Sequence, residues 1–432
     1  MTIQAVIAGQ RGRPRKHLDG EELLGRIARH VNQYGAGGLN LSALADDLGM
    51  PRKSLYYYCK SRDDLLATLY DAAVSRISGD LADAVAAATS PADAIERFIA
   101  ASLAYDGKGF VALTDIDFLD SIARETMHTR VAGLTAAIGQ VISRGVECEQ
   151  LRPCDAEIAA HLVMGMINWS RIYADWVGVR DTIAMRGRLC KAVTQLILRG
   201  MTDDAGVDIT FDVAVESLFP RNYDPFDRDE LARMKLEQIA MEASRLFNRR
   251  GIGATSLDEV AAAVGMTKPA LYNYFSSKDQ LISYCYQRSF TMIRRFIEAG
   301  EHSQSGLRQI GLAIHLNTQS QLGALHTLVP QPGASAIAEG ERQKIDQAVS
   351  GMITMAFRGY RRAMQDGSAR PLDIFATGSA VAGALLWLPK WLREGQDRIA
   401  VANEVNTILL HGLLDAGAAL KGFLSTNGAT IR

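Results

Sequence analysis

The sequence lacks most of the patterns that mark an enzyme site or a metal centre. Its five cysteines are scattered and form no Cys-x-x-Cys pair, so they indicate neither a zinc site nor a disulfide framework and fit a reducing cytoplasm. There is no Gly-rich phosphate loop, no metal-spaced group of histidines and carboxylates, and no nucleophile elbow. We therefore expect no catalytic residue, no metal and no cofactor, and predict that the protein is not an enzyme.

Long apolar runs and an excess of one charge are missing too. No stretch of about 18 apolar residues could span a membrane, and the first ten residues are too weakly apolar for a signal peptide. We therefore expect a cytoplasmic protein with no membrane partner. The formal net charge of −1 means that a nucleic-acid partner must be argued from local charge. Strand patterns are nearly absent, and helical periodicity over 432 residues predicts an all-α chain of several domains.

What the sequence does contain is an internal repeat. Residues 41–66 read LSALADDLGMPRKSLYYYCKSRDDLL and align without a gap with residues 257–282, and ten of the 26 positions are identical. A second similarity pairs Trp169 with Trp387 further along each half. Helical periodicity alone would not keep the Gly-Met, Tyr-x-Tyr and Ser-x-Asp positions in register. The repeat therefore predicts two copies of one two-part helical unit.

Local signals divide each copy into short helices. In the second copy Ser256 with Glu259, and Ser277 with Gln280, are capping boxes, and Thr267 is a further N-cap. Gly265 ends the short helix that Ser256 begins. Asn40, Gly49 and Ser61 hold the corresponding positions in the first copy. A short helix, a glycine turn and a second short helix predict a helix-turn-helix in each half.

The second helix of such a motif enters the DNA major groove with its N-terminal end. That end carries donors for phosphates and guanine edges in both copies: Arg52, Lys53 and Ser54 in the first, Thr267, Lys268 and Ala270 in the second. The alternative interpretation is a pair of helical hairpins with solvated ends. Because capping, turn and basic residues agree in both copies, we favour a double-stranded DNA operator as the partner.

These two runs resemble the N-terminal signature of the TetR/AcrR family of bacterial regulators. The resemblance covers about fifty residues in each half and implies a ligand-binding and dimerising helical domain after each DNA-binding unit. It implies that Tyr56 and Tyr272 touch the DNA backbone and that Arg62 and Lys278 bind phosphate. The neighbours Tyr57 and Asn273 complete the predicted DNA-binding residues. The first copy departs from the pattern, with Pro51 at the capping position and Cys59 where the second has Phe275.

Charge is unevenly distributed along the chain. Residues 11–78 carry a net charge of +3 and residues 228–296 a net charge of +4, which leaves −8 for the remainder. The first copy is also preceded by a basic arm of four side chains, Arg11, Arg13, Arg15 and Lys16. This arm either lies in a narrow minor groove, as an AT-hook does, or adds non-specific affinity as a basic tail. The second copy has no such arm, so the two units are not equivalent.

The predicted regulatory halves offer one candidate for ligand binding. Its residues are His161, Met164, Asn168, Trp169, Tyr173 and Trp176, with Trp387 from the matching segment. The alternative is that this aromatic stripe is packed core. The Asn-Trp-x-x-x-Tyr pattern loosely resembles family members that respond to acyl-CoA thioesters, so we expect a small apolar or acyl-CoA-type effector. If only one pocket exists, we expect it in the first half.

The repeat also predicts the domain order: an arm at 1–17, DNA-binding domains at 18–78 and 229–296, helical regulatory domains at 79–200 and 297–424, and a linker at 201–228 with a helix near 213–218. Since one chain holds both DNA-binding units, we predict a single-chain pseudo-dimer on an imperfect palindrome, with helices near 157–199 and 372–420 forming its interface. The alternatives are a dimer of chains with four such units, or a helical adaptor that binds no DNA.

Overall fold

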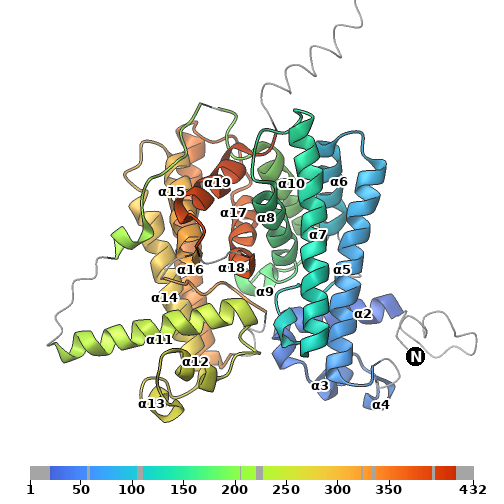
Figure 1. Ribbon diagram of the computed structural model, residues 1–432, viewed down its shortest axis with the longest axis vertical. Helices are drawn as coiled ribbons and strands as arrows, with labels where there is room; N and C mark the ends of the chain where they lie inside the picture. The colour runs from blue at the N-terminus through green and yellow to red at the C-terminus, as the bar shows by residue number, and fades with distance from the viewer. Residues whose placement is uncertain are drawn as a thin grey trace, which may run out of the picture.

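The computed structural model describes residues 20–55, 59–104, 110–204, 206–219, 227–322, 325–332, 337–391 and 395–414. In this part of the chain the structure is built from packed helices and contains no strand beyond one isolated bridge between Leu151 and Leu414 (Figure 1). The predicted all-α class is confirmed. None of the helices among these residues is both long and apolar enough to cross a membrane.

The first half begins with four helices that carry the repeated sequence: α2 (Gly20–Gly38), α3 (Leu41–Asp47), α4 (Arg52–Leu55) and α5 (Arg62–Ala87). The helical body follows as α6 (Pro91–Leu103), η1 (Ile116–Phe118), α7 (Ser121–Glu147), α8 (Ala156–Trp169), α9 (Tyr173–Val177) and α10 (Ile183–Arg199). Within α2 the backbone is not helical at Gly35, where φ is +75°, so the regular helix ends there.

The second half repeats this order. Its first four helices are α11 (Arg228–Arg250), α12 (Leu257–Ala263), α13 (Lys268–Tyr272) and α14 (Lys278–Ala299). Its body consists of α15 (Gly306–Leu322), α16 (Glu339–Gln365), α17 (Ile374–Leu386), α18 (Leu388–Trp391) and α19 (Arg398–His411). The longest body helices, α7 and α16, contain 27 residues each, and each is the second α-helix of its body.

Most of the predicted helix starts are confirmed by side-chain hydrogen bonds. Ser256 and Glu259 form a complete capping box at the start of α12. Asn40 caps α3, and Ser61 caps α5. The box predicted for Ser277 and Gln280 is half right: Ser277 accepts from the Gln280 N–H, but the Gln280 side chain accepts from the N–H of Ser276 instead of Ser277.

The two halves meet along α8 and α17, which lie side by side near the middle of the molecule (Figure 1). Glycines let the backbones approach: a β-carbon on Gly165 would lie 2.5 Å from the Gly383 carbonyl oxygen, and one on Gly383 would lie 3.0 Å from the Met166 Cα. At the end of this interface Gly200 and Gly412 also touch, since a β-carbon on Gly412 would lie 2.4 Å from the Gly200 nitrogen. These contacts join equivalent positions of the two halves.

The described part of the predicted linker, residues 201–204 and 206–219, is a strap that lies along α15 and α19. Asn403 on α19 receives the N–H of Phe211 (3.0 Å) and donates to its carbonyl oxygen (3.1 Å). On α15, Gln319 donates to the Val213 carbonyl oxygen (2.7 Å) and accepts from the Val215 N–H (3.2 Å). The helix expected near 213–218 is the short 3₁₀ helix η2 (Val215–Leu218). The strap is therefore bound to the second half along its length.

Candidate functional sites

Two helix-turn-helix units lie at the same end of the molecule, α3–α4 in one half and α12–α13 in the other (Figure 1). In each, the turn depends on a glycine with positive φ, +65° at Gly49 and +69° at Gly265. No other heavy atom would crowd a β-carbon at either glycine, so it is the backbone conformation that requires glycine there. The predicted turn chemistry is thus present in both copies.

The N-terminal ends of the two second helices face solvent. Arg52 and Lys53 of α4 are exposed, as are Thr267 and Lys268 at the start of α13. The Thr267 hydroxyl accepts from the Ala270 N–H (3.4 Å) and so caps this helix. The exposed basic side chains at these ends suit an anionic partner.

The remaining predicted DNA-binding residues of α13 also lie near this surface. Tyr272 is 46% exposed, Asn273 is exposed and Ala270 is half-buried. Lys268 is paired with Asp258 of α12 (2.7 Å), and this hydrogen bond raises the pKa of the lysine. Several other predicted positions, Arg11, Arg13, Arg15, Lys16, Tyr56, Tyr57 and the side chain of Ser54, lie outside the described residues.

Arg62 and Lys278 face inward, which differs from the free phosphate-binding side chains that the resemblance implied. The Lys278 ammonium donates to the Ile252 carbonyl oxygen (2.6 Å), and burial lowers its pKa. Arg62 donates to the carbonyl oxygens of Ala36 and Gly37. Both cations thus bind the backbone just beyond the glycine that ends the first helix of their unit. This geometry gives them a structural role in which each charge is bound to the protein's own carbonyls.

Sequence reasoning missed a second pair of equivalent residues, Asn32 and Asn248. Asn32 donates to the Phe110 carbonyl oxygen (3.0 Å) and accepts from the Ala112 N–H (2.8 Å). Asn248 makes the same two bonds, to Thr327 (2.7 Å) and from Val329 (3.0 Å). Each buried amide therefore fastens the first helix of a DNA-binding unit to a loop of the helical body. The repeat offset of 216 residues relates the two asparagines and was a usable signal.

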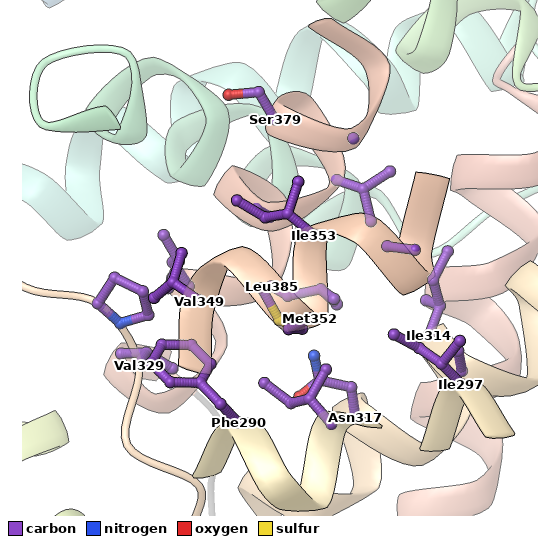
Figure 2. A pocket seen from close by; sticks show the side chains of 18 of the residues that line it. Phe290, Ile297, Ile314, Asn317, Val329, Val349, Met352, Ile353, Ser379 and Leu385 are labelled. Carbon is purple, nitrogen blue, oxygen red and sulfur yellow. The ribbon is translucent and has the colours of Figure 1, made fainter. Parts of the chain in front are cut away.

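A cavity of about 210 Å³ lies in the second half, between α14, α15, α16 and α17. Its wall is almost entirely apolar, with Phe290, Ile314, Met352 and Leu385 among the residues that Figure 2 shows around it. Asn317 points its amide into the space from α15 (Figure 2). Among the residues that the structure describes, no charged side chain lines the cavity. It therefore suits an uncharged, largely apolar molecule that can form a hydrogen bond with Asn317.

Two of the predicted ligand residues reach this cavity from the other half. Trp169 and Trp176 line it. Trp169 donates to the Ser379 hydroxyl (3.0 Å), and Trp176 donates to the Gln331 carbonyl oxygen (2.9 Å). A single pocket was expected in the first half, whereas most of the lining of this cavity comes from residues 290–386. The first half contributes these two indoles, which extend across the interface, and Val177.

The other predicted ligand residues are packed into the protein and do not line the cavity. His161 stacks on Trp391 at 4.3 Å between ring centroids. Asn168 is buried, accepts from the Leu113 N–H (2.7 Å) and donates to the Met164 carbonyl oxygen (2.9 Å). Three further residues, Met164, Tyr173 and Trp387, are buried as well. For these positions the packed-core alternative describes the structure.

Comparison with known sequences agrees with this arrangement of helix-turn-helix units and helical bodies. Residues 239–285 match the family described as bacterial regulatory proteins, tetR family, and residues 92–176 match the tetracyclin repressor-like C-terminal domain. The first match lies in the second half and covers a DNA-binding unit. The second match lies in the first half and covers part of its helical body. Each half of the chain therefore contains a segment that is similar to TetR-family regulators, a DNA-binding segment in one half and a C-terminal-domain segment in the other.

Curated relatives match the chain over short segments. It is 36% identical to the transposon Tn10 TetC protein of Escherichia coli over 61 residues, which are 14% of this chain and 31% of that protein. It is 43% identical over 53 residues to the HTH-type transcriptional regulator AcrR of Shigella flexneri, 12% of this chain and 25% of AcrR. The chain thus spans less than a third of the length of these relatives.

Similar solved structures each cover one part of the chain. AibR, in a complex with isovaleryl coenzyme A and operator DNA, is 21% identical with a TM-score of 0.35, over 41% of this chain and 99% of AibR. The TetR-family regulator PfmR from Thermus thermophilus is 22% identical with a TM-score of 0.35, again over 41% of this chain and 99% of PfmR.

Proposed function

We propose that the protein is a ligand-responsive, sequence-specific DNA-binding regulator and that it acts as a repressor. The observation that carries this proposal is the exposure of two basic helix ends, at Arg52 and Lys268, on helix-turn-helix units at the same end of one chain. Phosphate contacts would supply affinity and base edges would supply specificity. Repression is the simplest output, because a chain on its operator blocks the site until an effector releases it.

We propose further that one chain acts as a pseudo-dimer. The glycine pairs Gly165–Gly383 and Gly200–Gly412 support this, since each joins equivalent positions, as a two-fold interface between identical subunits does. The half-sites of the operator would then differ, because the α4 end carries Arg52 and Lys53 where the α13 end carries Lys268 and Pro269. For this arrangement we propose the domain boundaries given above, with DNA-binding domains at 18–78 and 229–296.

The effector that we propose is a small uncharged apolar molecule in the cavity between α14 and α17. Its apolar wall and the amide of Asn317 support this class. An acyl-CoA thioester fits less well, because none of the described lining side chains is basic and the phosphates would have no partner there. Bound molecules would contact both halves, through Trp169 and Trp176 on one side and α15 and α16 on the other.

One chain is expected to occupy one operator. The test is to select bound duplexes from a random DNA pool and then to measure the mass of the free protein and of the complex by light scattering at micromolar concentration. We expect a free mass near 47.0 kDa and one chain in each complex. A free mass of twice that value would support a dimer of chains with four DNA-binding units. Failure to enrich any duplex at low salt would support the adaptor alternative.

Lys278→Met is expected to lower the stability of the protein, and Lys268→Met is expected to lower the salt dependence of operator binding. Loss of the Lys278 ammonium leaves the Ile252 carbonyl without its donor, so we expect a loss of about 1 kcal/mol in the free energy of unfolding and no change in the salt dependence of operator affinity. Loss of the exposed Lys268 charge should spare stability and lower the slope of log affinity against log salt by about one. The measurements are urea denaturation and titrations at several salt concentrations. A smaller slope for Lys278→Met would show that this lysine binds phosphate.

A further inference from the structure

The two DNA-binding units touch each other directly, at a junction formed by Gly37, Gly253 and Phe118. A β-carbon on Gly37 would lie 2.8 Å from the Gly253 Cα, and one on Gly253 would lie 2.9 Å from the Gly37 Cα. The Phe118 ring lies 3.3 Å from either built β-carbon. The Arg62 guanidinium lies over the same ring, 4.4 Å from its centroid. At this junction the two backbones pack directly against each other, and the Phe118 ring contacts both glycines.

A buried carboxylate fixes the segment that carries Phe118. Asp115 accepts from the Ala36 N–H (3.1 Å), and a β-carbon on Gly251 would lie 3.2 Å from its Oδ1 atom. Asp115 therefore contacts the first unit by a hydrogen bond and lies against the second. In the second copy, Gln331 has the equivalent role and accepts from the Ile252 N–H (3.1 Å). The charge at this position is present in one copy only.

Lys390 of α18 supplies the cation for this carboxylate. Its ammonium donates to the Arg249 carbonyl oxygen in the last turn of α11 (3.2 Å) and interacts with the charges of Asp115 and Asp117. Burial raises the pKa of Asp115, and the charge of Lys390 opposes that rise. Leu385 and Leu386, five and four residues before Lys390, line the cavity. The junction is therefore linked by one short segment to the cavity wall.

We propose that the Gly37–Gly253–Phe118 junction sets the distance between the two recognition helices, and that it thereby selects the spacing of the half-sites in the operator. This inference rests on the proposed DNA binding. A tether alone would let the two units follow half-sites at several spacings, since flexible linkers tolerate a range of separations. Contact between backbones leaves no such freedom, because a packed junction is not continuously deformable. Half-sites must then match a fixed separation of roughly one helical turn.

Gly37→Ala and Gly253→Ala test this proposal, because each adds one methyl group where only movement of the opposite backbone can make room. Neither glycine has a positive φ, so alanine imposes no strain of its own. The probes are duplexes carrying the selected operator and versions with one or two base pairs added or removed between the half-sites. The matched control is Gly79→Ala on α5, where a β-carbon meets no other atom.

We expect both junction variants to bind the selected operator about tenfold more weakly than the wild type. Affinity should recover to within about twofold at a different spacing. Phe118→Leu should loosen the junction and so reduce the difference in affinity between spacings. Gly79→Ala should behave as the wild type does.

Equal weakening at every spacing or an unchanged spacing optimum in the glycine variants would overturn the proposal while leaving DNA binding intact. Unchanged discrimination between spacings in Phe118→Leu would overturn it as well. Wild-type protein that binds no duplex would instead overturn the proposed function itself. Thermal melting of each variant without DNA identifies one that fails to fold, and Phe118→Leu, which adds no atoms, then decides the question.

Discussion

Gly165→Ala is expected to destabilise the protein by about 3 kcal/mol, the upper range for overpacking a core. The added methyl group would lie 2.5 Å from the Gly383 carbonyl oxygen and 2.7 Å from the Trp387 Cβ. Neither atom belongs to the flexible end of a side chain, so α8 and α17 must move apart. Because these helices form the contact between the halves, much of the buried interface would be disturbed. Urea denaturation followed by circular dichroism measures the change.

The control, Gly133→Ala, should change stability in the opposite direction. Gly133 lies in the middle of α7 with no atom near a built β-carbon, so alanine there only favours the helix and should add about 0.5–1 kcal/mol. The pair separates packing from helix propensity, since both variants make the same chemical change in a helix. If Gly165→Ala were as stable as Gly133→Ala, the close crossing of α8 and α17 would be contradicted.

The DNA-binding units could be predicted from the sequence because their signals are local. A cap such as Asn40 or Ser256 acts on backbone groups two or three residues away, and a turn glycine such as Gly265 acts at its own position. Such signals can be recognised without knowledge of the tertiary fold. The repeat then supplied each signal twice, which distinguished the motif from ordinary amphipathic helices.

Side-chain direction could not be predicted in the same way. A basic residue at a helix start, such as Lys278, satisfies the pattern for a phosphate contact and equally that for a clamp on a neighbouring carbonyl. The choice depends on where Ile252 lies, 26 residues earlier in the chain. The position of the strap could not be predicted for the same reason, because its partners Gln319 and Asn403 are more than a hundred residues away in the sequence.

The position of the cavity depends on packing between halves, which periodicity does not encode. The spacing of Trp169 and Trp176 predicts one shared helical face, but Trp169 ends α8 and Trp176 lies on the separate helix α9. Both tryptophans do line the cavity. Nothing in that spacing indicates that the indoles of one half close a space made by helices of the other. Asn168, which shares the pattern, instead bonds Leu113 and Met164 within its own half.

Filling the cavity is expected to abolish the response to an effector while leaving the operator affinity unchanged. Ala356 of α16 lines the cavity, and phenylalanine at this position would occupy a large part of its roughly 210 Å³. Thr354→Phe is the matched control, because Thr354 is exposed on the same helix and is not part of the lining. Straight-chain alcohols from hexanol to dodecanol are suitable probes, since they combine an apolar chain with one hydroxyl that could bond the Asn317 amide.

In the wild type and in Thr354→Phe, the best alcohol should change tryptophan fluorescence through Trp169 and Trp176 and should raise the melting temperature. A ligand at a hundred times its Kd stabilises the folded state by about 2.7 kcal/mol, so the shift is readily measured. The same alcohol should release the operator, because it favours the state that binds it more tightly. Ala356→Phe should lose at least about tenfold in alcohol affinity and keep its operator affinity. A full response in Ala356→Phe would place the effector outside this cavity, and no response in the wild type would exclude neutral apolar alcohols as its ligands.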